Sequence, residues 1–350
     1  MCKLNEIDIQ RFRGIKELSL DGLHRVNVLL GNNNCGKSSA LEAIMIWMGA
    51  AKSSLAIEMN LNRDYNKVQE EDLKLFFHKL DIDTPIRISG RFADGTTRDL
   101  KINYFESKDK NMPISVNGNA EISREQSLFG LKYDYQDGKH VNTSTLTIDS
   151  AQRNIATNTS EKIPWAVKAA FVAPRYNFND FIKHFNRIVT DKEKENVLEV
   201  LRLVDSRIAD ITVVGDKVMV DIGLHKLVPI NVLGDGTRKM FTLVTAMYSV
   251  RNGILLIDEV DNGLYYKTMS VLWKALLKAS KSLDVQLFVS THSLDSLNAL
   301  SRTLAADSFS DMRNEVELLT LRREDDDTII SYRYDYDKFS YVLDMEVEIR

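Results

Sequence analysis

The chain has 350 residues, of which 44% are hydrophobic and 27% are charged, a composition typical of a folded globular protein and not of a disordered one. Forty-six basic residues against fifty acidic ones give a net charge of −4, so no global positive field indicates a nucleic-acid partner. No apolar run reaches the ~20 residues that span a bilayer, and the N-terminus lacks the basic and apolar segments of a signal peptide. We therefore expect a folded cytoplasmic protein with no membrane contact, and its two cysteines exclude a disulfide framework.

The first half of the chain predicts a strand, a loop, a buried helix and then a β-rich region. Alternating apolar residues and two glycine turns predict a hairpin that leads into a buried strand at 26–30. A helix over 37–51 is apolar on nearly every face, which indicates burial inside a larger body. Residues 53–79 predict polar helical material, and short β runs broken by Asp-Gly turns predict an antiparallel β lobe over 84–150. The polar stretch 142–160 is interpreted as a flexible connection.

The second half alternates strands and helices. A short strand at 169–173 precedes amphipathic helices over 178–211. Strands at 254–257 and 285–289 then alternate with helices, and a β hairpin over 316–334 follows. This alternation favours an α/β fold with a mainly parallel central sheet.

A complete phosphate-binding loop pattern, G-x-x-x-x-G-K-[ST], stands between the predicted strand and the predicted helix. It comprises Gly31, Asn32, Asn33, Asn34, Cys35, Gly36, Lys37 and Ser38, with Ser39 following. Such a loop turns backbone N–H groups toward the phosphates of a nucleotide, and the helix adds its positive N-terminal end. We predict that Lys37 supplies a point charge to the phosphates and that the Ser38 hydroxyl is a ligand for Mg²⁺. The thiol of Cys35 is either a reactive group beside Lys37 or a small side chain that points into the core.

Two later strands end in residues that fit the same chemistry. The strand at 254–257 ends in Asp258 and Glu259, and the next strand is followed by His292. Polar side chains at the carboxyl ends of parallel strands lie where ligands bind in α/β sheets. We predict that Asp258 holds the Mg²⁺ of the nucleotide and that Glu259 is the catalytic base for an attacking water. His292 is predicted to contact the γ-phosphate and to orient Glu259; acidic capping of a strand and an incidental histidine are the alternatives.

A second glycine-bearing helix start follows Leu233, at Gly234, Asp235 and Gly236. The free N–H groups of such a helix start form another anion site. Because one phosphate tail needs one such site, we expect this helix to cap a nucleotide held by another subunit. An ordinary glycine-rich helix start is the alternative.

Together, these elements resemble the ABC-type ATPases. The narrower resemblance is to the soluble branch with the structural-maintenance-of-chromosomes (SMC), RecF-like and overcoming-lysogenisation-defect (OLD-like) ATPases, which includes ATPase subunits of bacterial anti-phage systems. The sequence Phe12-Arg13-Gly14 and the segment 258–264 carry it. It implies a single P-loop ATPase domain over 1–350. Its parts are the β lobe at 84–150, a helical signature lobe at 175–240 and a part at 251–350 that carries Asp258, Glu259, His292 and the hairpin.

The resemblance also implies a homodimer or larger homo-oligomer that traps ATP and Mg²⁺ between one P-loop and the partner's signature loop. Arg13 matches the arginine that reaches the phosphates, and Asp261 falls in the loop that senses the opposite site. Two departures stand out. Gly234 replaces the serine of the signature, which leaves capping to Gly236 and backbone N–H groups. No clear glutamine follows the strand at 169–173, and Arg175 or Asn177 are its stand-ins.

Two functions follow from this resemblance. The first is a sensor and scaffold ATPase that gates a separate effector chain, a Toprim-type nuclease or a toxin, in anti-phage defence. The roughly sixty residues after His292 are too few for a complete Toprim domain, so we expect the effector on another chain. The alternative is a RecF-like repair ATPase that binds DNA across its β lobes. The lysines of that lobe are Lys101, Lys108, Lys110, Lys132 and Lys139. They are interleaved with acidic residues, which favours a solvated face of mixed charge.

Overall fold

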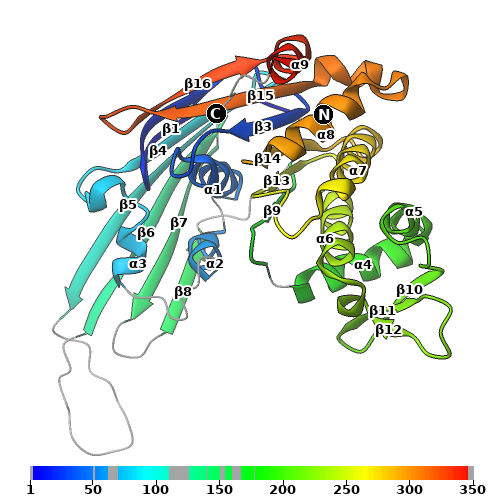
Figure 1. Cartoon of the computed structure of the whole chain (residues 1–350). Coiled ribbons are helices and arrows are strands. Elements are labelled where there is room, and N and C mark those ends of the chain that lie inside the picture. The colour runs from blue at the N-terminus through cyan, green and yellow to red at the C-terminus, as the bar shows by residue number, and fades with distance from the viewer. Residues whose placement is uncertain are drawn as a thin grey trace, which may run out of the picture.

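The structure, a computed structural model, describes residues 3–49, 52–61, 70–109, 126–138, 140–149, 154–159, 167–176 and 178–345. Within these ranges the chain forms a thirteen-stranded mixed sheet with the strand order β8-β7-β6-β5-β4-β1-β2-β16-β15-β3-β14-β13-β9, and a separate three-stranded sheet, β10-β11-β12 (Figure 1). The fold is therefore of the α/β class, as predicted.

The strands of the large sheet are β1 (Leu4–Phe12), β2 (Ile15–Leu20), β3 (Val26–Leu30), β4 (Ile86–Phe92), β5 (Thr97–Asp109), β6 (Gln126–Asp137), β7 (His140–Asp149), β8 (Asn154–Thr159), β9 (Ala169–Val172), β13 (Ile254–Ile257), β14 (Gln286–Ser290), β15 (Val316–Arg323) and β16 (Thr328–Tyr334). The small sheet contains β10 (Asp210–Val214), β11 (Lys217–Asp221) and β12 (Val228–Pro229). The α-helices are α1 (Lys37–Met48), α2 (Leu55–Leu61), α3 (Glu70–Lys74), α4 (Phe178–Thr190), α5 (Lys194–Val204), α6 (Asp235–Ser249), α7 (Met269–Ser282), α8 (Leu294–Ala305) and α9 (Tyr336–Asp344). Short 3₁₀ helices are η1 (His78–Leu80), η2 (Ile230–Leu233), η3 (Tyr266–Thr268) and η4 (Asp307–Glu315).

The centre of the sheet is parallel. Strands β15, β3, β14, β13 and β9 are neighbours that run in the same direction. Every residue of β3, β13 and β14 is buried, as is usual for parallel strands covered on both faces. The loops that follow β3, β13 and β14 therefore meet at one edge of the sheet, where ligands bind in such folds.

Helices cover both faces of this parallel centre. Leu255 and Ile257 of β13 belong to a hydrophobic cluster with α4 to α8, whereas Ile254 and Leu256 belong to a second cluster with α1 and the antiparallel strands. Successive side chains of a strand point to opposite faces, so α1 lies on one face and α6 and α7 lie on the other (Figure 1). In the described part of the chain, no helix is long and apolar enough to cross a membrane.

The antiparallel strands extend the same sheet. Strand β1 pairs with β2 and β4, and β5 to β8 follow as antiparallel neighbours that project from the body of the molecule (Figure 1). The prediction of a flexible connection over 142–160 is wrong, because 140–149 form β7 and 154–159 form β8. The error came from polarity: the buried positions of β7 alternate through Asn142, Ser144, Leu146 and Ile148, and period-two burial with threonines between is typical of a strand.

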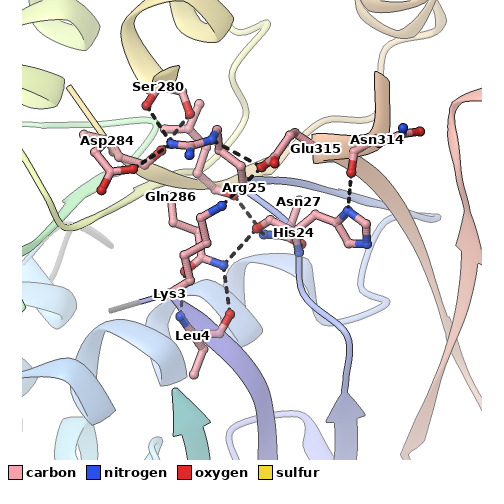
Figure 2. Close-up of polar contacts among 12 residues, drawn as sticks. Lys3, Leu4, His24, Arg25, Asn27, Ser280, Asp284, Gln286, Asn314 and Glu315 are labelled. Atoms are coloured by element: carbon pink, nitrogen blue, oxygen red, sulfur yellow. Dashed lines mark hydrogen bonds and ion pairs between the residues drawn. The ribbon is translucent and has the colours of Figure 1, made fainter. Parts of the chain in front are cut away.

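A buried polar network fastens the start of β1 to the parallel centre, at the sheet edge opposite the P-loop (Figure 2). Gln286 is fully buried. Its Oε1 accepts the N–H of Leu4 at 2.8 Å, and its Nε2 donates to the carbonyls of Leu4 and His24 at 2.9 and 2.8 Å. Around it, Arg25 donates to the Ser280 carbonyl and pairs with Asp284 and Glu315 (Figure 2). The antiparallel strands and the parallel centre are thus held together by side chains as well as by the sheet.

Candidate nucleotide-binding site

The P-loop, residues 31–38, connects β3 to α1. At two of its glycines, a Cβ would clash with a neighbouring atom. Gly31 has φ +128°, and a Cβ there would lie 2.3 Å from the Leu321 carbonyl oxygen. Gly36 has φ +100°, is the N-cap of α1, and would place a Cβ 2.4 Å from the Ile329 side chain. Among the described residues no side chain caps α1, and its first turn holds no acidic residue. The positive end of α1 is therefore available to an anion.

Lys37 and Cys35 take different positions around this loop. The Lys37 Nζ donates to the carbonyls of Gly31 and Asn32 at 2.7 and 2.9 Å, so the ammonium lies across the loop. Cys35 is 4% exposed and belongs to the hydrophobic cluster of α1. The Lys37 Nζ also lies 3.6 Å from the Cys35 Sγ, so the thiol is buried and at the same time beside Lys37, and its reactivity stays a prediction.

One cavity gathers most of the predicted site. Its volume is about 660 Å³, and residues from the P-loop and from the ends of β13 and β14 line it. The predicted residues at its wall are Arg13, Asn33, Asn34, Gly36, Lys37, Ser38, Ser39, Asp258, Glu259 and His292. Gly14 of the Phe12-Arg13-Gly14 motif also lines it, as do residues that the sequence did not single out: Leu75, Phe77, Lys79, Leu80 and Arg323. Asn32 and Cys35 line a neighbouring groove instead.

One hydroxyl, that of Ser290, contacts both acidic residues at the end of β13. Asp258 is 5% exposed, and its Oδ1 accepts the Ser290 hydroxyl at 2.5 Å. The same Ser290 Oγ accepts the backbone N–H of Glu259 at 2.8 Å. Glu259 has φ +49°, a conformation that costs free energy and persists where the surroundings impose it. Ser290, on the adjacent strand, is thus a part of the site that no sequence motif indicated.

Asp261 is held within its own chain. Its Oδ1 accepts the Thr291 hydroxyl at 2.5 Å, and Thr291 is fully buried after β14. The role predicted for Asp261, contact with the opposite site of a dimer, stays a prediction.

Lys239 connects the helix α6 to the end of β13. It is 4% exposed, and its Nζ donates to the Glu259 carbonyl at 3.4 Å. Burial lowers the pKa of the Lys239 ammonium, while the neighbouring carboxylates act in the opposite direction. The signal for it in the sequence was weak, because a lysine in a helix is most often exposed.

The glycine-bearing start of α6 lies away from this cavity. Gly234 has φ +93°, and no atom of the described residues lies within 4 Å of the position that a Cβ on Gly234 would take. A Cβ on Gly236 would lie 3.7 Å from the Leu264 side chain, and a Cβ on Gly263 would lie 3.9 Å from Asp235. Neither Gly234 nor Gly236 is among the described residues that line the cavity. The start of α6 therefore adjoins the 261–264 segment of its own chain and not its own P-loop.

Arg13 lines the cavity and is paired with the helix that follows the P-loop. Its side chain is 7% exposed and its Nε lies 2.6 Å from a carboxylate oxygen of Glu42 on α1. The guanidinium carbon lies 4.4 Å from the ring centroid of Phe76, and Nη2 donates to Asn60 at 3.2 Å. Contact between Arg13 and a phosphate therefore stays a prediction.

The stand-ins for the missing glutamine follow β9. Arg175 lies within the described residues but not among those that line the cavity, and Asn177 lies outside the described residues. The identity of that residue therefore stays a prediction.

Comparison with known proteins gives one family and several relatives. A family described as "AAA domain, putative AbiEii toxin, Type IV TA system" matches residues 26–298. An "ATP/GTP phosphatase" of Helicobacter pylori is 24% identical over 372 aligned residues that cover 98% of each chain. The "DNA replication and repair protein RecF" of Shewanella frigidimarina is 36% identical over 119 residues, 32% of each chain. Among solved structures, an SMC head bound to the C-terminal winged-helix domain of ScpA has a TM-score of 0.50 and 12% identity, covering 97% of this chain and 99% of that one.

Proposed function

This chain belongs to the AbiEii-type AAA domain family, and we propose that it is an ATPase whose copies close head to tail around the nucleotide to gate a separate effector. It is an ABC-type ATPase of the SMC and RecF branch. We treat 1–350 as a single ATPase domain in which the β lobe and the signature lobe flank one site. The observation that carries the proposal is the cavity that unites Lys37, Glu259 and His292 while leaving Gly236 outside.

The residues at the cavity fit ATP with Mg²⁺. The uncapped start of α1 and Lys37 suit the negative phosphates. Ser38 and Asp258 offer a hydroxyl and a carboxylate, the oxygen donors that Mg²⁺ takes together with phosphates and water. Within the described residues there is no group of three or more His, Cys, Asp or Glu that would hold a metal ion by itself. We infer that the cation arrives with the nucleotide, where it neutralises phosphate charge.

Hydrolysis would then proceed by attack of water on the γ-phosphate. In our proposal Glu259 orients the water and accepts its proton, because it is a half-buried carboxylate at the cavity wall. His292 lines the same wall and is exposed, so it can hydrogen-bond to the γ-phosphate and to Glu259. Ser290 keeps the backbone of Glu259 in its left-handed conformation.

The exposed start of α6 supports a site shared between two chains. A helix N-terminus attracts anions within about its first turn, and the glycines of this one are not among the described residues that line the P-loop cavity of the same chain. A head-to-tail dimer with two-fold symmetry would place it over the P-loop of the partner in both sites at once. ATP would then close the dimer, and hydrolysis would open it.

We propose the partner and the biological role from the family description. The family description names a toxin–antitoxin system, which supports a cytoplasmic role in anti-phage defence, like the OLD-like ATPases, with a nuclease or toxin on a second chain. The RecF-like alternative has weaker support, because the RecF relative matches 32% of the chain and Lys132 of the β lobe pairs with Asp134 at 3.1 Å. Of the other lysines in that lobe, Lys110 and Lys139 lie outside the described residues.

The Glu259→Gln variant tests the proposal. It should bind ATP with Mg²⁺ as the wild type does, hydrolyse it at least about a hundredfold more slowly, and accumulate as a dimer or larger assembly in light scattering. Lys37→Ala is the matched control, which should neither bind tightly nor assemble. Wild-type turnover in Glu259→Gln, or wild-type protein that stays monomeric at saturating ATP, would contradict the proposal. For the effector, the chain encoded beside this gene should co-purify with ATP-bound Glu259→Gln and not with Lys37→Ala.

A further inference from the structure

The turn of the β15–β16 hairpin lies against the mouth of the nucleotide cavity. Arg323 is the last residue of β15, and its side chain is 23% exposed. Its Nε donates to the carbonyl oxygen of Asn34 in the P-loop at 3.0 Å, and its Nη1 donates to the carbonyl of Gly14 at 2.5 Å. One guanidinium therefore joins the P-loop to the turn between β1 and β2, and both segments line the cavity.

Asp327 holds the same guanidinium from within the hairpin. Its Oδ1 lies 3.1 Å from Arg323 Nη1, and its Oδ2 lies 3.0 Å from the Lys79 ammonium and 3.6 Å from His78 Nε2. The carbonyl of Asp327 also accepts the N–H of Lys16 at 3.0 Å. Lys79 and Arg323 hold the pKa of the Asp327 carboxyl below its usual value. Four segments that are distant in the sequence thus meet at one charged pair.

The backbone around this pair is shaped to admit it. A Cβ on Gly14 would lie 2.8 Å from Arg323 Nη2, so the guanidinium packs closely against this glycine. Asn34 has φ +65°, and Arg13 beside Gly14 has φ +50°. Positive φ at residues other than glycine persists where neighbouring contacts impose it. Arg323 makes such a contact with the carbonyl of Asn34 itself and with the carbonyl of Gly14, the residue after Arg13.

We propose that Arg323 and Asp327 are positioning residues, which hold the P-loop and the β1–β2 turn in the geometry that binds nucleotide. This inference rests on the proposed nucleotide site and adds the C-terminal hairpin to it. Arg323 also places a permanent positive charge at the wall of the cavity that the phosphates would occupy. The pair acts on affinity for the nucleotide, whereas Glu259 acts on the chemical step.

The adjacent residues of the hairpin provide matched controls. The side chain of Arg322 is 65% exposed, and its ion pair within the described residues is with Glu324 at 3.3 Å. Asp326 is 57% exposed and pairs with Lys16 at the surface. Arg322→Ala and Asp326→Asn therefore remove the same charges from the same hairpin while the contacts of Arg323 with Asn34, Gly14 and Asp327 remain.

The experiment measures affinity for a fluorescent ATP analogue with Mg²⁺, kcat and KM for ATP, and Tm without nucleotide. Charged hydrogen bonds of this kind carry enough free energy for Arg323→Ala to raise Kd and KM about tenfold or more. We expect kcat to change less than threefold, Tm to stay within a few degrees of Arg322→Ala, and Arg323→Lys to recover part of the affinity. Asp327→Asn should weaken binding by itself and add little to Arg323→Ala, because the two residues act as one unit.

The outcomes separate this inference from the proposed function. Wild-type affinity in Arg323→Ala, with Lys37→Ala impaired, would overturn the role of Arg323 and leave the nucleotide site standing. A proportional loss of Tm, kcat and affinity in both Arg323→Ala and Arg323→Lys would show a purely structural residue and would also overturn it. Absence of nucleotide binding in the wild type would overturn the site and this inference together.

Discussion

Ser290 on β14 and Asp258 at the end of β13 are joined by a hydrogen bond of 2.5 Å, and the same hydroxyl oxygen accepts the N–H of Glu259. The two strands are parallel neighbours, with Ile257 opposite Val289 in the register. The hydroxyl therefore sets the orientation of the carboxylate proposed for Mg²⁺ and of the backbone that carries the proposed base. Ser290, at the end of β14, thus orients the two acidic residues at the end of β13.

Ser290→Ala should lower kcat about tenfold at saturating ATP and shift the Mg²⁺ dependence to higher concentration. The reason is that Asp258 and the Glu259 N–H lose a buried partner, and each such loss costs about 1–3 kcal/mol. Steady-state kinetics across Mg²⁺ concentrations measures both effects. The control is Ser293→Ala, which removes the cap of α8 and should lower Tm without a specific effect on Mg²⁺ dependence. Equal kinetics in the two variants would refute the role of Ser290.

Mixing two inactive proteins tests the shared site. Gly236→Asp should abolish activity because its carboxylate repels the partner's nucleotide. The substitution should not disturb the fold, because a Cβ at Gly236 would lie at an ordinary contact distance of 3.7 Å from Leu264 of its own chain. Combined with Lys37→Ala protomers, it should regain up to about a quarter of wild-type activity, because half of the dimers are mixed and each has one intact site. ATPase assays on equimolar mixtures give the answer. Mixed dimers that form but remain inactive would count against a site built from two chains.

Gln286→Leu should destabilise the fold by about 3 kcal/mol, because it leaves buried backbone groups of Leu4 and His24 without their side-chain partner. Urea unfolding measures the loss. Gln136→Leu, at an exposed position of β6, is the control and should change stability by less than about 0.5 kcal/mol. A difference within error between the two variants would mean that the network of Figure 2 contributes little.

Cys35 should react slowly with a maleimide in the folded protein. The residue is 4% exposed within a hydrophobic cluster, and we expect this burial to outweigh the effect of the Lys37 ammonium 3.6 Å from the sulfur, because a buried thiol is inert. In a Cys2→Ala background, labelling followed by mass spectrometry should be slow with or without MgATP and fast in denaturant. Rapid labelling that MgATP suppresses would instead restore the reactive alternative.

The sequence by itself determined the parts of the site that are local. The P-loop is one continuous stretch whose residue types are dictated by phosphate binding, so the motif could be identified from the sequence alone. The ends of the strands at 254–257 and 285–289 were placed at one edge because the carboxyl ends of parallel strands coincide there. The sequence also predicted a helix start at the glycine-bearing segment 234–236, and α6 begins there, with Gly234 as its N-cap.

Only the tertiary structure decided which distant residues complete the site. Arg323 contacts Asn34 across 289 positions, and Ser290 reaches Asp258 because strand order and register set β14 beside β13. Such contacts depend on which strands are neighbours, and no local pattern encodes that. The prediction of a flexible connection over 142–160 was wrong because β7, which lies within the β lobe predicted over 84–150, has polar residues at buried positions, and because residues 155–158 of β8 are exposed. The fold also placed α6 and α1 on opposite faces of the same sheet, and Gly236 is not among the described residues that line the P-loop cavity.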